Sequence, residues 1–398
     1  MSGAEPTPSG ALTAPAVCID ITRQVHVIDR LGRRHPLSSD QRILWASWED
    51  ATPKGGSYLW PTWSPDGRYI ATFCHFPTGA EMPRVTVFEV GGVVDTELLR
   101  LDHRLPIYLH WSPDGQWLAV MSQDGSQLFL STARLAHVGH EVRLAQGSPL
   151  FFTWLDDGRL AAFVGDGRTG ELLLLDPEGV TSPVVLPGTP GNFCAPVWSG
   201  ERLYYVTWEK GRTSIVAADV ETGQVDELEE VVGLVGLVAS PDGRFVARAL
   251  APGGDGTPYR HLAVFDTSTG KNLPIADHEC LAFFWIPGAD ALLVSRVDME
   301  QNVLRWDVLD LDGNLVPIAE THPTRDMGFY LRFFEQYSQS HPLVDPTGRW
   351  VLLSGGLVGH GGSDSTPHLW LVPLGGGEPH SLGYGLFGAW GPTSARIG

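Results

Sequence analysis

The stretch Trp63-Ser64-Pro65-Asp66-Gly67 decides the fold, because the chain repeats it. It returns as Trp111-Ser112-Pro113-Asp114-Gly115 and, without the tryptophan, as Ser240-Pro241-Asp242-Gly243. Three such matches in one chain indicate an internal repeat, and self-similarity at a regular spacing is the signature of a repeat architecture.

Weaker copies fill the intervals between the clear ones. They are Trp154-Leu155-Asp156-Asp157-Gly158, Trp198-Ser199-Gly200, Trp285-Ile286-Pro287-Gly288, Asp345-Pro346-Thr347-Gly348 and Trp390-Gly391-Pro392. With the tryptophan position as marker, and Ala239 and Val344 standing in where it is absent, the steps are 48, 43, 44, 41, 46, 59 and 46 residues. This period is typical of four-stranded propeller blades.

Each unit also has a regular internal pattern. Pro-Asp-Gly favours a tight turn, and an apolar strand such as Tyr69-Ile70-Ala71 follows it. A third strand then ends in an acidic or glycine turn, as in Val85–Glu89, and a more polar outer strand such as Glu97–Leu101 completes the unit. The sequence therefore predicts hairpin-connected strands a, b, c and d, with the tryptophan as a wedge between neighbouring sheets.

These residues resemble the bacterial TolB-type, or PD40, propeller repeat, whose pattern is P-x-W-S-P-D-G, an apolar strand and then an I-y-v-v-D-l-d-G-like strand and turn. The resemblance covers the chain from about Ala16 to Pro392. It implies an all-β propeller and no single function, because related propellers include periplasmic scaffolds, the non-catalytic domains of prolyl peptidases and some polysaccharide lyases.

The two ends of the chain are expected to share one blade. Eight residues follow Trp390, enough for one strand, while Val17–Ile21, Val25–Asp29 and His35–Leu37 read as strands b, c and d. Such a shared blade pairs the sheet edge that would otherwise stay open. We therefore expect an all-β fold, a single closed β-propeller of eight four-stranded blades, with seven as the alternative if the unit after Val344 is misread.

The chain is strongly acidic, with 27 Lys and Arg against 46 Asp and Glu and a formal net charge of −19. Such a field repels phosphate backbones and anionic lipids, so we expect neither nucleic acid nor a membrane as a partner. No apolar run reaches the ~18–20 residues of a membrane span, and the N-terminus lacks the basic start and apolar run of a signal peptide. The expectation is a cytoplasmic protein with a disordered leader at residues 1–15 and one propeller domain at 16–398.

Long connections are expected on one face of the propeller. Connections from strand d to the next a and from b to c emerge on that face, which we call the long-loop face, whereas the a–b turns on the other face are short. The long connections are His75–Pro83, Ala251–Arg260, Gly355–Thr366 and the longest, Ile318–Ser340. Long loops on a rigid scaffold commonly carry function, so we expect a binding site there.

The longest connection accounts for the 59-residue step and carries aromatic residues at 330, 333, 334 and 337, a helical spacing. One interpretation is a short amphipathic helix that plugs the propeller mouth, with its rings packed against neighbouring loops. The other is a lid or pocket wall, in which Tyr330, Arg332, Glu335 and Tyr337 contact a ligand. Both interpretations place this inserted loop or helix, residues 318–340, on the long-loop face.

Histidines are the remaining candidate ligand-binding residues. His75, His110, His341 and His360, together with His103, lie in or beside connections on the long-loop face. Three or more at the axis could bind a divalent metal. No H-x-H or H-E-x-x-H motif is present, and the four cysteines form no C-x-x-C pair. No cofactor is therefore expected, with a divalent metal as the less favoured alternative.

Three functions stay open on these grounds. The leading hypothesis is a non-catalytic binding or scaffold protein that holds a protein segment or a small polar ligand on the long-loop face, because no catalytic constellation is recognisable. An alternative is a lyase-type enzyme acting on a polar substrate in an axial pocket, with His and Tyr as acid and base and with a His-bound divalent metal. A third is a structural subunit of a larger assembly, which predicts an apolar patch on the outer strands.

Overall fold

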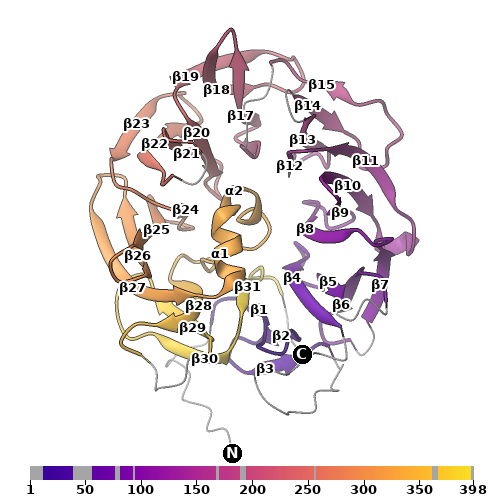
Figure 1. Ribbon diagram of the computed structural model, residues 1–398, viewed down its shortest axis with the longest axis vertical. Helices are drawn as coiled ribbons and strands as arrows, with labels where there is room; N and C mark the ends of the chain where they lie inside the picture. The colour runs from indigo at the N-terminus through magenta and orange to yellow at the C-terminus, as the bar shows by residue number, and fades with distance from the viewer. Residues whose placement is uncertain are drawn as a thin grey trace, which may run out of the picture.

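The computed structural model describes residues 12–38, 56–76, 81–92, 95–166, 170–188, 194–254, 257–360 and 366–395. Within these ranges the chain forms antiparallel β-sheets arranged in a ring around two short helices (Figure 1). The prediction of an all-β fold is therefore confirmed.

Five sheets each contain four strands that are consecutive in the chain. The first two comprise β4 (Ser57–Trp63), β5 (Tyr69–His75), β6 (Arg84–Glu89) and β7 (Asp95–Arg100), then β8 (Leu105–Trp111), β9 (Leu118–Asp124), β10 (Gln127–Ala133) and β11 (Val142–Gly147). The next two comprise β12 (Leu150–Trp154), β13 (Leu160–Gly165), β14 (Gly170–Leu175) and β15 (Val184–Val185), then β16 (Val197–Ser199), β17 (Arg202–Glu209), β18 (Arg212–Ala218) and β19 (Val225–Val231). The fifth comprises β20 (Leu234–Ala239), β21 (Phe245–Ala251), β22 (Arg260–Asp266) and β23 (Asn272–Ala276). In these five sheets the predicted order of strands a to d is present.

The repeated Ser-Pro-Asp-Gly sequence forms the turn between the first and second strands of a sheet. Ser64 Oγ donates to Asp66 Oδ1 (2.6 Å) and accepts from the backbone N–H of Tyr69 (2.9 Å). The same two hydrogen bonds recur in the turns at Ser112 and Ser240. The glycine that closes each turn has a φ between 68° and 72°, a conformation that only glycine adopts at little cost. The motif is therefore a turn that its own side chains hold closed.

Tryptophans at the ends of the innermost strands join neighbouring sheets. Three of them donate an indole N–H to a backbone carbonyl of the preceding sheet: Trp111 to Thr62 (3.3 Å), Trp154 to His110 (3.1 Å) and Trp285 to Val238 (2.9 Å). The acceptor is always the residue just before the marker position of that sheet. These contacts support the structural interpretation of the repeated tryptophan.

A sixth four-stranded sheet contains segments from both ends of the chain. Its order is β3 (Arg34–Pro36), β2 (Val25–Ile28), β1 (Ala16–Ile19) and β31 (Phe387–Trp390). β1 pairs antiparallel with β31, with Ala16 opposite Trp390 and Ile19 opposite Phe387. The predicted pairing of the N-terminal strands with the segment that contains Trp390 is therefore present.

The seventh sheet has seven strands and joins two predicted units. They are β24 (Ala282–Trp285), β25 (Ala291–Asp298), β26 (Val303–Asp310), β27 (Leu315–Pro323), β28 (Trp350–Leu357), β29 (His368–Pro373) and β30 (His380–Tyr384). β27 runs past the length of an ordinary outer strand and pairs with β28, with Thr321 opposite Leu357. The expectation of a loop from residue 318 is therefore wrong for residues 318–323, because the pairing with β26 continues as far as Thr321 and the pairing with β28 covers residues 321–323. The innermost position of the second unit is held by a single bridge between Val344 and Val351.

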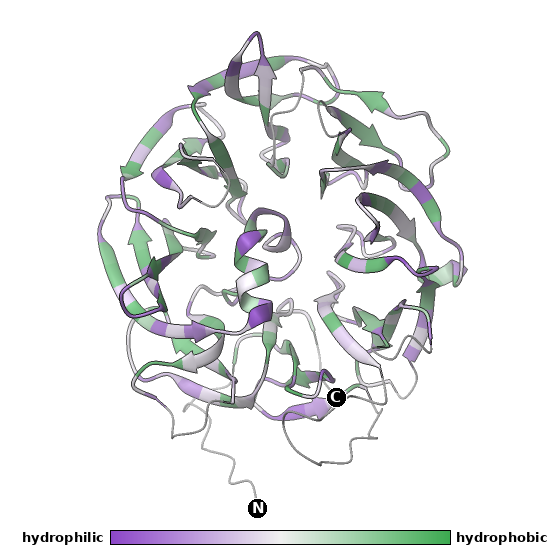
Figure 2. Ribbon diagram, viewed as in Figure 1, coloured by the Kyte–Doolittle hydropathy of each residue, from purple (hydrophilic) through white to green (hydrophobic). Residues whose placement is uncertain are grey.

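The remainder of this connection forms α1 (Arg325–Arg332) and α2 (Phe334–Tyr337). Thr324 Oγ1 caps α1 by accepting from the backbone N–H of Met327 (3.0 Å). The two helices lie inside the ring of sheets (Figure 1), and both carry hydrophilic as well as hydrophobic residues (Figure 2). The prediction of a short helix in this connection is confirmed. No helix in the described part of the chain is long and apolar enough to cross a membrane.

The hydrophobic core lies between the sheets and continues to the axis. Its largest cluster contains residues of the innermost strands, such as Tyr108 and Phe283, together with Tyr330, Phe334 and Tyr337 of the helices. The two helices are therefore part of the core.

Candidate functional site

Residues 324–341, which we call the axial plug, fill the centre of the ring. Tyr330 and Tyr337 are 0% and 2% exposed, and Glu335 is 8% exposed. Arg332 is the one exposed residue of the four that the sequence put forward as ligand contacts here. The burial favours the interpretation of this segment as a plug over that of a movable lid.

Side chains of the plug bond to four different sheets or to the turns beside them. The bonds join Arg23 to Asp326 (2.6 Å), the Tyr337 hydroxyl to the Ile107 carbonyl, Gln336 to the backbone of Phe152 (2.9 and 2.7 Å) and the Tyr259 hydroxyl to Glu335 Oε1 (2.9 Å). A segment fixed at four points around the ring is held rigidly.

Two of the predicted histidines come together at the axis. His341 is buried, with its Nδ1 2.7 Å from Ser340 Oγ, and its ring lies 6.0 Å from that of Tyr108. The ring of His110, on β8, also lies 6.0 Å from that of Tyr108. Burial lowers the pKa of His110 to about 3, with a smaller contribution from His341, and lowers the pKa of His341 to about 4. Both rings are therefore neutral at pH 7.

The other predicted histidines lie elsewhere. His75 ends β5 opposite Ser57, and His360 lies beside Glu378, with 3.3 Å between Nε2 and Oε2. His103 is exposed after β7. Within the described ranges no group of three or more His, Cys, Asp or Glu is placed to hold a metal ion.

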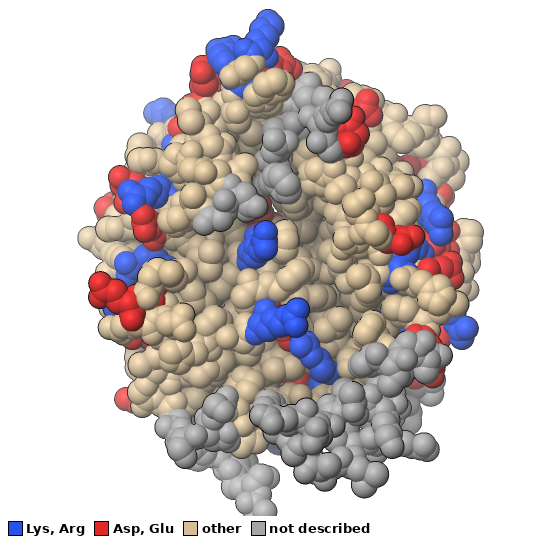
Figure 3. All heavy atoms as spheres, in the orientation of Figure 1, with Lys and Arg blue, Asp and Glu red and all other residues tan. Residues whose placement is uncertain are grey.

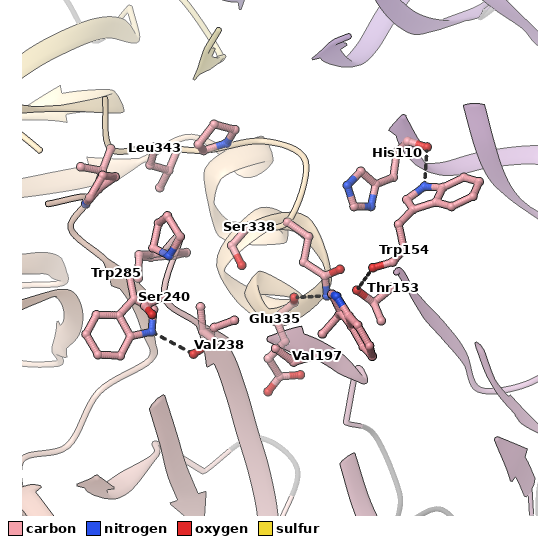
Figure 4. Close-up of a pocket in the computed structure, with 18 of the residues that line it drawn as sticks. His110, Thr153, Trp154, Val197, Val238, Ser240, Trp285, Glu335, Ser338 and Leu343 are labelled. Atoms are coloured by element: carbon pink, nitrogen blue, oxygen red, sulfur yellow. Dashed lines mark hydrogen bonds between the residues drawn. The ribbon is translucent and has the colours of Figure 1, made fainter. Parts of the chain in front are cut away.

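A cavity of about 390 Å³, which we call the axial cavity, lies between the plug and the ends of the innermost strands (Figure 4). Tyr330, Glu335, Ser338 and Gln339 of the plug line one end of it. Residues of the short a–b turns line the other end: Pro113, Asp156, Pro241 and Pro287. The cavity therefore faces the short-turn side, away from the long-loop face on which the sequence led us to expect a site.

Burial determines the charge of the acid in this cavity. It raises the pKa of Glu335 to about 8, against the opposing effect of hydrogen bonds from Tyr259 and from the backbone of Ala195. Glu335 is therefore mostly protonated at pH 7 and can donate as well as accept a hydrogen bond.

A larger cavity of about 840 Å³, which we call the helix-side groove, lies beside α1 on the long-loop face. Gly328, Leu331 and Arg332 form its wall on α1. Connections after β21, β23 and β25 form the rest, including Glu279 and Met299. Arg332 is thus the one predicted ligand contact that lines the groove.

The centre of this face is locally basic although the chain as a whole is acidic. Figure 3 shows Lys and Arg side chains over α1, while most Asp and Glu side chains lie toward the rim. Arg325 and Arg332 are the exposed basic residues of α1. An acidic group is therefore attracted to the middle of the face.

Sequence reasoning missed several residues of both cavities. Met299, 84% exposed, has a visible signal, since it is an apolar residue within the acidic turn Asp298-Met299-Glu300. Trp198 and Gln339 line the axial cavity but resemble ordinary repeat and loop residues in the sequence.

Comparison with known proteins agrees with this architecture. No family model matches the chain. The Tol-Pal system protein TolB of Francisella tularensis subsp. tularensis (strain WY96-3418) is 31% identical over 112 residues, which is 27% of this chain and 26% of that protein. The chain thus spans about a quarter of the length of the curated relatives it matches first.

Solved structures define the class of protein as a β-propeller. The β-propeller domain of the Trilobed protease from Pyrococcus furiosus has a TM-score of 0.50 at 14% identity, over 83% of this chain and 98% of that one. TolB from Acinetobacter baumannii has a TM-score of 0.42 at 13% identity, over 77% of this chain and 64% of that one. More particularly, the chain is similar to TolB, and the resemblance inferred from the Ser-Pro-Asp-Gly repeats is confirmed.

Proposed function

We propose that this chain is a non-catalytic binding propeller that holds an extended protein segment in the helix-side groove. The observation that carries the proposal is the position of α1: it presents Arg332 to the groove from a plug that is bonded to four sheets. Binding sites gain affinity when they are rigid before the ligand arrives, since less ordering is needed on binding.

The lining of the groove suggests the chemistry of the segment. Met299 and Val297 are 84% and 50% exposed and offer apolar contact. The Arg332 guanidinium lies over the Phe333 ring, 5.6 Å from its centre, and attracts a carboxylate. The proposed partner is therefore a segment that alternates apolar and acidic side chains.

The test is affinity capture with three versions of the full chain. Arg332→Glu reverses the charge in the groove, and Arg68→Glu makes the same change in an exposed short turn on the opposite face. We expect the wild type and Arg68→Glu to retain the same protein partner and Arg332→Glu to lose it. A partner retained equally by all three chains would contradict the proposal.

The lyase-type alternative has one observation in its favour, the meeting of His110, His341 and Tyr108 at the axis. Metal analysis of the purified chain is its first test, since the hypothesis as stated includes a His-bound divalent ion. The structural-subunit alternative would use exposed Val180, Val184 and Val185 at the edge strand β15.

Two finer parts of the proposal concern the whole chain. We infer eight blades, with β28–β30 and the bridge at Val344 as one blade and the sheet that contains β1 and β31 as another. We also keep the cytoplasmic location as a proposal, which cell fractionation tests.

A further inference from the structure

The axial cavity is lined by Trp198, one of three exceptions to the tryptophan contacts described above, since the Nε1 atoms of Trp63 and Trp390 also have no hydrogen-bond partner among the described residues. Trp111, Trp154 and Trp285 donate to the carbonyl just before the marker of the preceding sheet. By this rule Trp198 would donate to the carbonyl of Thr153, but its buried Nε1 has no hydrogen-bond partner among the described residues. Because a buried donor without a partner costs free energy, the exception needs an explanation.

Two further lining residues share this property. His110 Nδ1 and Gln339 Oε1 are buried, and neither has a hydrogen-bond partner within the described ranges. Residues of the cavity lining thus carry an unpaired donor on Trp198, an unpaired acceptor on Gln339 and an imidazole nitrogen that serves as either, according to its tautomer, and all three atoms are covered. Figure 4 shows His110 on one side of the cavity, across from Trp285 and Ser240.

The lining offers no counter-charge for an anion. None of its residues is Lys or Arg, and the carboxylate of Asp156 lies at the short-turn end. Burial keeps Glu335 mostly protonated and His110 neutral at pH 7. An anionic ligand would therefore lose its hydration without gaining a cation, and an uncharged ligand is favoured over an anionic one.

The remaining walls are aromatic and apolar. Trp154, Phe284 and Trp285 line the cavity together with several prolines. Its volume of about 390 Å³ lies within the ~300–1,000 Å³ of small-molecule sites, which combine such walls with a few polar groups.

We propose that the axial cavity binds an uncharged sugar, with a pyranose ring packed against the tryptophans and its hydroxyls bonded to Trp198, His110 and Gln339. A hydroxyl both donates and accepts, so one class of ligand satisfies all three atoms. Each of these atoms is covered in the structure, so the proposal requires the three side chains to turn toward the cavity when the sugar binds. This site is separate from the helix-side groove and does not depend on the function proposed for that groove.

The first test compares charged and uncharged probes by saturation-transfer NMR and calorimetry on the full chain at pH 7. The probes are D-glucose, maltose and D-glucuronate. We expect saturable binding of maltose or glucose, and binding of glucuronate at least about tenfold weaker because its carboxylate would be buried without a partner. Absence of saturable binding of both uncharged sugars, or equal affinity for glucuronate, would overturn the proposal.

The second test uses a matched pair of tryptophans on adjacent strands. Trp198→Phe removes the indole N–H that lines the cavity, while Trp208→Phe makes the same change at a residue that is 56% exposed on β17. We expect Trp198→Phe to weaken sugar binding about threefold to tenfold, the value of one hydrogen bond, and Trp208→Phe to leave it unchanged. Equal effects of the two substitutions, or none from Trp198→Phe, would overturn the assignment.

Gln339→Met provides a second cavity variant in case Trp198→Phe impairs folding, which circular dichroism reports. It keeps the length of the side chain and removes the amide. A folded Gln339→Met chain that binds maltose as tightly as the wild type would also overturn the proposal. Arg332→Glu is expected to bind the sugar normally, so failure of the sugar site and failure of the groove are distinguishable.

Discussion

Glu335, His110 and His341 are three titratable side chains whose ionisation is strongly shifted by burial at the axis. The pKa of Glu335 rises from 4.5 to about 8, so between these values the folded chain holds a proton that the unfolded chain has lost. Its contribution to stability therefore falls as the pH rises through this window. The two histidines have the opposite effect, because their pKa values fall from 6.5 to about 3 for His110 and about 4 for His341. Below about pH 6.5 the unfolded chain takes up protons that the folded chain does not, so the contribution of these histidines to stability falls as the pH falls.

Replacement of the acid tests the first of these effects. Glu335→Gln keeps an oxygen that accepts from the Tyr259 hydroxyl but cannot ionise. Between pH 5 and 8 we expect the free energy of unfolding of the wild type to fall by up to about 1.4 kcal/mol per pH unit more than that of the variant. Chemical denaturation at several pH values measures this difference. A wild type and a variant with parallel pH profiles would contradict the burial of an ionisable acid at this position.

The histidines permit a direct measurement. In the folded chain we expect the ring nitrogens of His110 and His341 to stay neutral down to about pH 5, as seen by ¹⁵N-detected NMR of labelled histidines. Protonation of either axial ring above pH 5 would refute this prediction.

The axial plug is the element that separates the two cavities. Its sequence predicts a helix, because aromatic residues at 330, 333, 334 and 337 have helical spacing. The sequence could not predict which side of the helix faces the core, because Arg332 and Tyr330 are both plausible ligand contacts until the packing is known. The structure buries Tyr330 and exposes Arg332, which leaves one wall of the helix-side groove on an element that the core holds in place.

A pair of phenylalanines tests the role of the plug. Phe334 is 1% exposed and packs against Phe283 and Phe284, whereas Phe329 is 39% exposed. We expect Phe334→Ala to lower the free energy of unfolding by about 3–5 kcal/mol, and Phe329→Ala to lower it by distinctly less, because only the first leaves a cavity in the core. Thermal and urea unfolding measure both. Equal, small effects would indicate a lid that opens freely.

The extension of β27 shows why the sequence pattern did not predict where this strand ends. Residues 321–323 continue the strand because β28 offers a second pairing edge. That edge comes from a part of the chain beyond the plug, so a local pattern of apolar and polar residues carries no information about it.

At the scale of the whole molecule, the periodic turns predict the arrangement of sheets well. Each Ser-Pro-Asp-Gly turn closes through its own side chains, so its effect is local and visible in sequence. The axial cavity is different, since its lining comes from five innermost strands or their turns, from the plug and from residues 342–344. No short stretch of sequence contains it, and the unpaired indole of Trp198 could be recognised only after its neighbours were placed.

Pairing of β1 with β31 gives a prediction for the whole chain. Ala16, Val17, Cys18 and Ile19 are all 0–1% exposed, so removal of residues 1–19 uncovers both β2 and β31. We expect this truncation to cost more than about 4–5 kcal/mol of unfolding free energy or to abolish cooperative unfolding, measured by calorimetry. Removal of residues 1–11 leaves β1 intact and is the control. Similar melting of the two truncated chains would contradict an essential role for the pairing.

The position of β31 in the chain has a consequence for biosynthesis. Translation produces β1 before every other described strand and β31 after them, so one edge of β1 waits without its partner while the strands between them leave the ribosome. The plug emerges before β31 and can settle at the axis before β1 and β31 pair. The axial segment is thus in place before the two distant strands meet, and the nascent chain carries an unpaired strand edge, a template for wrong association, while all the strands between β1 and β31 are made.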